Sequence, residues 1–351
     1  MCFQNAENVR SLISAAAESG TPFLFAVDYE LGEGMYVEAP AKQGRVLYAV
    51  PQSSNKPPFS LRTAGPGAAL GTGTCGPRAK PCSSTILPSP MSPAEYKSKF
   101  DTVQQAILRG ETHLANLTVR TPIQCEIGLE EIFQRATAPF KLLVPGRFVC
   151  FSPERFVKIA RDGIISTNPM KGTIDASVPD AQTVILEDVK ELEEHQASVD
   201  LLKNELGVWA KSVTVERFRY IDRIQAGNRE LLQVSSLITG TLPSDWRANL
   251  GRILFDMLPV GSCTGVPKQS TIQVLQAAEG EPRGYYTGVF GYFDGEELDS
   301  AVMIRFIEEQ DGLLYFRSGG GITARSDWQR EYQETLQKIY LPFSKRLGIR
   351  G

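Results

Sequence analysis

The pattern of hydrophobic and polar residues predicts a chain in which helices and strands are mixed. A helical repeat covers residues 9–18, and apolar runs typical of strands follow at residues 21–27 and 46–50. Ser92-Pro93-Ala94-Glu95 has the cap and the early acid that open a helix, which we expect to end near Gly110. Further strands are expected at residues 163–167 and 313–317, and further helices at residues 188–206 and 328–341.

One segment, residues 51–90, has little periodicity and is rich in Pro, Gly, Ser and Ala. Such a composition predicts a long surface loop or a disordered insert. Its Gly-x-Gly triplets lack the strand, G-x-G-x-x-G and helix context of a dinucleotide site, which we therefore reject. We expect one unit over residues 1–351, made of a short strand and helix region (1–50), this loop (51–90) and a core (91–351).

The helix predicted at residues 188–206 has two stripes. The apolar stripe, expected to face the core, is formed by Val189, Leu192, Val199, Leu202 and Leu206. The acidic stripe is formed by Glu187, Glu191 and Glu194. An acidic stripe is usually a solvated face, but carboxylates are also the groups through which proteins bind Mg²⁺. A second acidic pair, Glu331 and Glu334, lies in the last helix, and the sequence leaves open whether the two clusters meet.

Composition excludes several classes of protein. The chain has 351 residues, 42% of them hydrophobic, so it can bury a large core, while a net charge of −3 gives no reason to expect nucleic acid or an anionic membrane as partner. The sequence lacks an export signal and an apolar run of membrane-spanning length, so we expect a cytoplasmic protein. Six cysteines without a CxxC pair fit reduced thiols, and two histidines make a His-rich metal site improbable.

Lys171 is the first candidate for chemistry. It lies between Pro169, which stiffens the chain, and Gly172, which permits a turn and a close backbone approach. A lysine held at such a place can act as an amine nucleophile if it is neutral. For an arbitrary lysine, an exposed position in a turn is the commoner interpretation, so its neighbours in the fold decide between the two.

Two glycine-containing runs are candidates for ligand binding. Gly319-Gly320-Gly321 is expected to follow the strand at 313–317, either as a tight turn or as an anion cradle completed by Arg305, Arg317 or Lys338. Residues 261–268 lack the Gly-Lys-Ser/Thr adjacency of a phosphate loop, which argues against an NTPase. The same run matches the Gly-x-Cys-x-Gly form of a glutaminase elbow, but both histidines precede its cysteine, so we interpret that match as chance.

Several motifs together resemble those of chorismate-utilising enzymes, in the same order, from about residue 91 onward. The motifs are Pro169-Met170-Lys171-Gly172-Thr173, Glu191-Leu192-Glu193-Glu194-His195, Gly288-Val289-Phe290-Gly291-Tyr292, Gly319-Gly320-Gly321 and Glu331-Tyr332-Gln333-Glu334-Thr335. The resemblance implies an α+β fold with two large, mostly antiparallel sheets packed face to face, helices outside and the site in a deep cleft.

Position 171 discriminates within that family, because anthranilate and isochorismate synthases typically carry alanine there and aminodeoxychorismate synthases carry lysine. Gln233 occupies the position of the anthranilate synthase histidine, and Leu114 that of the isochorismate synthase base. The resemblance therefore implies the branch of aminodeoxychorismate synthase component I, a transferase that aminates chorismate at C4 through a lysine adduct at C2. Anthranilate synthase component I is the alternative, and a non-catalytic chorismate-binding subunit a remote one.

The resemblance also implies roles for individual residues. Lys171 would be the nucleophile and Glu154, in a Ser-Pro-Glu run, the acid that protonates the departing C4 hydroxyl. Mg²⁺ would be held by Glu194 and Glu331, with Glu191 and Glu334 in support. Substrate would be bound by Thr173, Thr264, Tyr286, Arg305, Gly320, Gly321 and Lys338. A glutamine amidotransferase subunit would supply the ammonia, and the product, 4-amino-4-deoxychorismate, would serve p-aminobenzoate and folate synthesis.

Overall fold

The computed structural model describes residues 2–55, 86–226 and 229–343. Most of the segment predicted to be a loop or a disordered insert, residues 51–90, lies outside the described residues. The parts of it that are described include two short strands, β5 (Ser53–Ser54) and β6 (Leu87–Pro88).

The first sheet is antiparallel throughout and carries strands from both ends of the chain. Its order is β1 (Cys2–Asn5), β3 (Glu33–Glu38), β2 (Phe23–Val27), β16 (Val289–Phe293), β17 (Leu298–Val302), β10 (Arg155–Ile159), β11 (Ile164–Thr167), β14 (Arg229–Thr241) and β12 (Met170–Asp175). A further strand, β13 (Lys211–Ala226), pairs with β14.

The second sheet is also antiparallel. Its order is β15 (Gly265–Val266), β7 (Leu114–Gln124), β19 (Leu313–Ile322), β18 (Phe306–Gln310), β9 (Phe148–Ser152), β8 (Phe140–Val144), β4 (Leu47–Val50) and β5, while β6 pairs with β7. An apolar cluster joins the two sheets, with Leu24 and Phe290 from the first against Leu142 and Phe306 from the second. The sheets therefore pack face to face.

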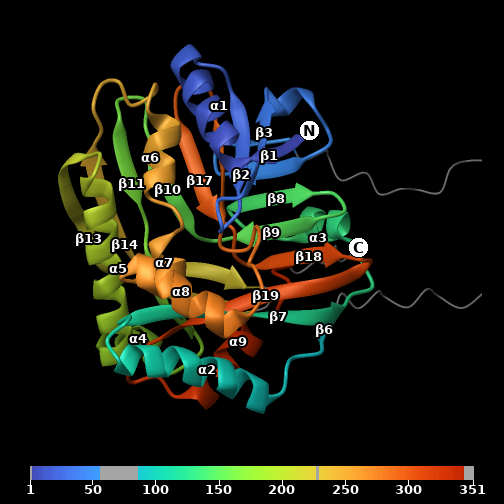
Figure 1. Ribbon diagram of the computed structural model, residues 1–351, viewed down its shortest axis with the longest axis vertical. Helices are drawn as coiled ribbons and strands as arrows, with labels where there is room; N and C mark the ends of the chain where they lie inside the picture. The colour runs from blue at the N-terminus through green and yellow to red at the C-terminus, as the bar shows by residue number, and fades with distance from the viewer. Residues whose placement is uncertain (1, 56–85, 227–228, 344–351) are drawn as a thin grey trace, which may run out of the picture.

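Helices cover the outer faces of this pair of sheets (Figure 1). On the first sheet lie α1 (Ala6–Ser19), α5 (Val189–Gly207) and α6 (Leu250–Asp256), which share one apolar cluster with its strands. Around the second sheet lie α2 (Pro93–Leu108), α3 (Leu129–Arg135), α8 (Lys268–Glu279) and α9 (Trp328–Gln337). Shorter helices are η1 (Pro40–Lys42), α4 (Ala181–Glu187) and α7 (Gly261–Thr264). The predicted α+β fold with two large antiparallel sheets is confirmed.

Local signals placed several elements correctly. The capping box predicted at Ser92 and Glu95 is present, with the serine side chain accepting from the Glu95 backbone N–H. Asp188 caps α5, and this cap separates Glu187, which ends α4, from the glutamates of α5. The last helix is shorter than expected and ends at Gln337. None of the helices in the described ranges is long and apolar enough to cross a membrane.

The apolar stripe of α5 was only partly right. Val199, Leu202 and Leu206 are buried, but Val189 is 58% exposed and Leu192 is 39% exposed. The inward face is continued toward the N-terminus by polar residues, Glu194, His195 and Ser198, all of them buried. The first two turns of α5 therefore turn polar side chains inward, which is the arrangement expected beside a site.

Candidate active site

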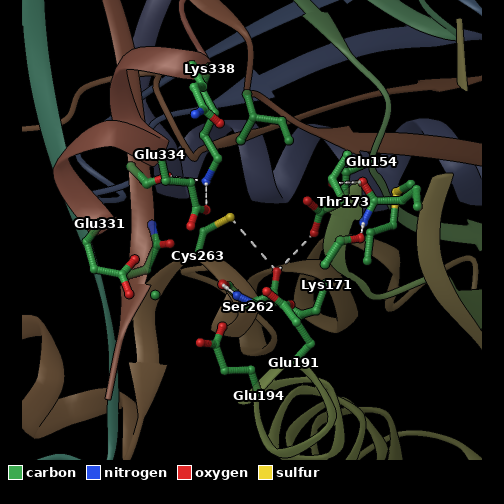
Figure 2. A pocket seen from close by; sticks show the side chains of 18 of the residues that line it. Glu154, Lys171, Thr173, Glu191, Glu194, Ser262, Cys263, Glu331, Glu334 and Lys338 are labelled. Atoms are coloured by element: carbon green, nitrogen blue, oxygen red, sulfur yellow. Dashed lines mark hydrogen bonds and ion pairs between the residues drawn. The ribbon is translucent and has the colours of Figure 1, made fainter. Parts of the chain in front are cut away.

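A cavity of about 780 Å³ lies among β12, α5, α7, β19 and α9. All but two of the residues to which the resemblance gave a role line it, namely Glu154, Lys171, Thr173, Glu191, Glu194, Tyr286, Arg305, Gly321, Glu331, Glu334 and Lys338. Figure 2 shows Glu331 and Glu334 on one side of it, with Glu154 and Thr173 on the opposite side. The exceptions are Gly320, which pairs with Leu117 in the sheet, and Thr264, whose buried hydroxyl donates to the Val260 carbonyl at 2.8 Å.

Lys171 lies in a β-bulge rather than in a simple turn. Met170 pairs with Ser235 and Thr173 with Gln233, so three steps along β12 match two steps along β14. Such an extra residue redirects side chains at the bulge. Gly172 has φ +80°, a backbone conformation that favours glycine, and a Cβ there would lie 2.8 Å from Glu191 Oε2, so that the Glu191 carboxylate would have to move. The Lys171 amine lies 3.5 Å from the Ser262 carbonyl oxygen.

Glu154 faces Lys171 across Ser262. Its side chain is buried, and its Oε1 accepts a hydrogen bond from the Ser262 hydroxyl at 3.1 Å. Burial raises the pKa of Glu154, an effect that the positive charge of Lys171 and the Ser262 hydrogen bond only partly oppose. A carboxyl group that keeps its proton to higher pH, within a hydrogen-bonded path to an amine, is suited to general acid catalysis.

Lys190 links the two acidic clusters. Its ammonium lies 2.8 Å from Glu331 Oε1 on α9 and 3.3 Å from Glu194 Oε1 on α5. Glu331 is 1% exposed, and its second oxygen, Oε2, has no hydrogen-bond partner. Glu194 Oε1 also lacks a partner with hydrogen-bond geometry, despite its short distance to Lys190. The structure thus brings together the carboxylates whose meeting the sequence left open.

The remaining two glutamates differ in their electrostatics. Burial raises the pKa of Glu191 to about 7, and the charge of neighbouring Glu194 adds to this. Burial also raises the pKa of Glu334, but Lys338, with its ammonium 2.8 Å from Glu334 Oε1, and other cations more than offset it, so the net change is downward. Glu334 therefore stays ionised beside a cation.

The carboxylates fit a divalent cation held by two protein ligands. Within residues 2–55, 86–226 and 229–343, no group of three or more His, Cys, Asp or Glu side chains is arranged to hold a metal ion. Mg²⁺, however, is commonly bound through one or two carboxylates completed by water and substrate oxygens. Glu194 and Glu331 offer such a pair, since both are buried, both carry an oxygen without a hydrogen-bond donor, and one lysine ammonium reaches both.

The three glycines lie within β19 rather than after it, so the predicted end of this strand was wrong. They pair with Thr118, Leu117 and Asn116 of β7. A Cβ on Gly321 would lie 3.0 Å from Glu194 Oε2, and one on Gly319 would lie 2.8 Å from the Leu117 carbonyl oxygen. Their missing side chains therefore leave room for the carboxylates and for the neighbouring strand.

Of the three cationic side chains expected near these glycines, two line the cavity and one lies outside it. Arg305 and Lys338 line the cavity, and Lys338 donates to the Gly319 carbonyl at 2.6 Å. Arg317 is buried elsewhere, in ion pairs with Glu308 and Glu281. Arg317 is therefore not available to bind an anion in the cavity.

Sequence reasoning missed Lys190, Ser262 and Asn116 as cavity residues, and it noted Gln233 only as a departure from a motif. Lys190 precedes Glu191 directly, which was a usable signal. Ser262 lies in the run considered above as a phosphate loop or a glutaminase elbow. Neither pattern reports on the cavity, so the role of this serine follows from the structure.

The chain belongs to the chorismate binding enzyme family, whose model matches residues 30–343. This confirms the family that the motifs indicated, although the match begins well before the expected residue 91. The cavity described above is therefore the candidate active site of a member of a chorismate-utilising enzyme family.

The curated relatives of this chain are named for more than one enzymatic activity. An uncharacterized PabA-like protein of Haemophilus influenzae is 44% identical over 92% of this chain and 92% of its own length. The aminodeoxychorismate synthase component 1 of Salmonella typhimurium is 32% identical over 72% of this chain and 57% of its own. The anthranilate synthase component 1 1 of Haloarcula marismortui is 35% identical over 69% of this chain and 51% of its own. The chain is thus a homologue of both synthases and matches just over half of their length.

Solved structures support the fold. The anthranilate synthase component I of Streptococcus pneumoniae superposes with a TM-score of 0.61 at 24% identity, covering 72% of this chain and 58% of its own. The menaquinone-specific isochorismate synthase of Escherichia coli gives 0.70 at 16% identity, covering 96% and 82%. These similarities establish the anthranilate synthase component I-like fold.

Proposed function

We propose that this protein is an aminodeoxychorismate synthase component 1, which replaces the C4 hydroxyl of chorismate by an amine. The observation that carries the proposal is the position of Lys171, whose amine enters the same cavity as Glu154 and is connected to it through Ser262. A nucleophile and an acid close together in one cavity suit a displacement in two steps. The homologous synthase of Salmonella typhimurium is consistent with it.

In the first step, the neutral Lys171 amine forms a bond to C2 of chorismate. The two ring double bonds shift, and the C4 hydroxyl leaves as water after taking the proton of Glu154. In the second step, ammonia forms a bond to C4, the double bonds shift back, and the bond between C2 and Lys171 breaks. The excess proton of the attacking Lys171 nitrogen returns to Glu154, and that of the attacking ammonia passes to the departing Lys171 amine. The net reaction therefore consumes chorismate and ammonia and yields 4-amino-4-deoxychorismate and water.

We propose that two groups of residues neutralise the negative charges of the bound substrate. Arg305 and Lys338, with Tyr286 and the Gly321 amide, would bind the carboxylates of chorismate. Gly320, which does not line the cavity, and Thr173, whose hydroxyl donates to Gln233 at 2.6 Å, have no part in this binding. Glu194 and Glu331 would hold Mg²⁺, supported by Glu191 and Glu334. When bound, the ion would offset the charge of the ring carboxylate. Thr264, whose hydroxyl is engaged by Val260, has no part in this proposal.

Ammonia is proposed to come from a separate glutamine amidotransferase subunit. Cys263, which matched a glutaminase elbow in sequence, is 7% exposed, and burial together with the charge of Glu154 raises the pKa of its thiol to about 12. A thiol so rarely ionised is a poor nucleophile. Cys263 is therefore not proposed as the ammonia-releasing cysteine, and we assign that role to the separate subunit.

The test combines the purified protein, chorismate, Mg²⁺ and ammonium, with and without an added aminodeoxychorismate lyase. We expect p-aminobenzoate only when the lyase is present. Fluorescent anthranilate without the lyase would instead identify the second candidate, anthranilate synthase component I, which the Haloarcula marismortui relative favours.

A lysine variant tests the covalent step. Lys171→Ala should lose C4 amination, whereas Lys97→Ala, which removes a half-exposed lysine paired with Asp101 on α2, should not. Full aminodeoxychorismate formation by Lys171→Ala would refute the role of Lys171.

A further inference from the structure

Gln233 contacts the bulge that carries Lys171 through both ends of its side-chain amide. Its Nε2 donates to the Gly172 carbonyl oxygen at 2.7 Å, and its Oε1 accepts from the Thr173 hydroxyl at 2.6 Å. The Gly172 carbonyl can only accept, so the amide has one orientation that satisfies both contacts. Gln233 lies on β14, is 8% exposed, and lines the cavity.

The bulge needs such a restraint more than the rest of β12 does. Regular pairing between β12 and β14 is interrupted between Met170 and Thr173. The interrupted stretch contains Gly172, at φ +80°, and glycine has the widest choice of backbone conformations. An unrestrained bulge would let the Lys171 amine occupy many positions in the cavity. The Gln233 amide holds the two residues that follow Lys171.

We propose that Gln233 is a positioning residue, which fixes the bulge so that the Lys171 amine points at the bound substrate. The inference rests on the proposed role of Lys171 as nucleophile. Gln233 is distinguished from a substrate-binding group by its contacts, because both polar ends of its side chain are used by β12. A displacement of about 1 Å at a reacting atom can cost roughly a hundredfold in rate.

The experiment measures how fast the Lys171 adduct forms with saturating chorismate and Mg²⁺ in the absence of ammonia. Samples are quenched in acid at successive times and weighed intact by mass spectrometry. Chorismate affinity and thermal unfolding are measured in parallel. The wild-type protein and four variants are compared: Gln233→Leu, Gln233→Glu, Thr173→Val and the double variant Gln233→Leu/Thr173→Val.

Gln233→Leu should slow adduct formation by about 10–100-fold while chorismate affinity changes less than about twofold. Gln233→Glu keeps the acceptor for Thr173 but loses the donor for Gly172, so we expect it to be nearly as slow. Thr173→Val, at an exposed position that tolerates the change, should slow the step by about fivefold. The double variant should be no slower than Gln233→Leu, because both changes break one contact network.

Gln124→Leu, at an exposed glutamine at the end of β7, is the matched control and should form the adduct at the wild-type rate. Adduct formation at the wild-type rate in Gln233→Leu and Thr173→Val would overturn the positioning role alone. A loss of chorismate affinity with an unchanged adduct rate would make Gln233 a substrate-binding residue instead. Absence of the adduct in the wild-type protein would overturn the covalent role of Lys171 and this inference with it.

Discussion

Replacing Arg283 by methionine should destabilise the protein strongly, because this arginine is the largest of the fully buried side chains in the described part of the chain. It is 1% exposed and forms an ion pair with Glu279 at 2.7 Å. It also donates to the carbonyl oxygens of Cys263 and Asn116, at 2.8 Å and 2.7 Å, and to the Thr287 hydroxyl at 3.3 Å. One side chain therefore satisfies four neighbours.

The expected loss follows from these contacts. Leaving one partner of a buried ion pair uncompensated costs about 3–5 kcal/mol. Each lost hydrogen bond adds about 1 kcal/mol, so the free energy of unfolding should fall by roughly 6 kcal/mol. That is a large share of the roughly 5–15 kcal/mol that holds a typical protein folded. Cys263, Asn116 and Thr287 line the cavity, so we also expect the KM for chorismate to rise.

Urea unfolding followed by circular dichroism measures this loss, and a second substitution tests its cause. Glu279 accepts from the Thr118 backbone N–H at 2.9 Å, a bond that a glutamine can retain. The double variant Arg283→Met/Glu279→Gln should therefore recover about 2 kcal/mol or more relative to Arg283→Met, because no buried charge is left unpaired. A loss below about 1 kcal/mol in Arg283→Met, or a double variant less stable than the single one, would refute the reasoning.

Two further predictions concern the cavity. Burial raises the pKa of Glu154, and a general acid must be protonated, so its contribution to kcat should be lost as pH rises through that raised value. Glu154→Gln should lower kcat by about 10²–10⁴-fold in the lyase-coupled assay, and an undiminished rate would exclude Glu154 as the acid. Lys190→Met should lower the free energy of unfolding in EDTA by about 3 kcal/mol, because Glu194 and Glu331 lose their counter-ion. It should also tighten Mn²⁺ binding measured by electron paramagnetic resonance, and affinity equal to that of Lys97→Met would contradict a shared cation site.

The sequence predicted the site better than it predicted the contacts within it. Lys171, Glu154 and the four glutamates each lie in a recognisable motif, so their presence in one cavity could be expected. Lys190 and Gln233 contact partners on other elements: Lys190 of α5 contacts Glu331 of α9, and Gln233 of β14 contacts Gly172 of β12. Local periodicity carries no information on such pairings, so their roles required the structure.

The errors in the fold have a related cause. Gly319-Gly320-Gly321 has the composition of a turn, yet these residues are strand, because they pair with Thr118, Leu117 and Asn116 of β7. A side chain at Gly319 would collide with β7, and one at Gly321 would press on Glu194. Val189 and Leu192 fit the apolar period of α5, yet they are exposed, because the inward positions near the cavity are taken by Glu194, His195 and Ser198. In both places the requirements of the cavity override the local preference.

The link between Lys190 and Glu331 joins residues 141 positions apart, and it has a consequence for biosynthesis. Contacts of such sequence separation carry a loop-closure cost and require all of the intervening chain to be present. A nascent chain whose α5 has emerged from the ribosome, but whose α9 has not, has Glu191 and Glu194 available without Glu331, Glu334 or Lys338. Such a chain lacks half of the acidic cluster and one of its cations. The growing polypeptide therefore acquires its complete cavity only after α9 has left the ribosome.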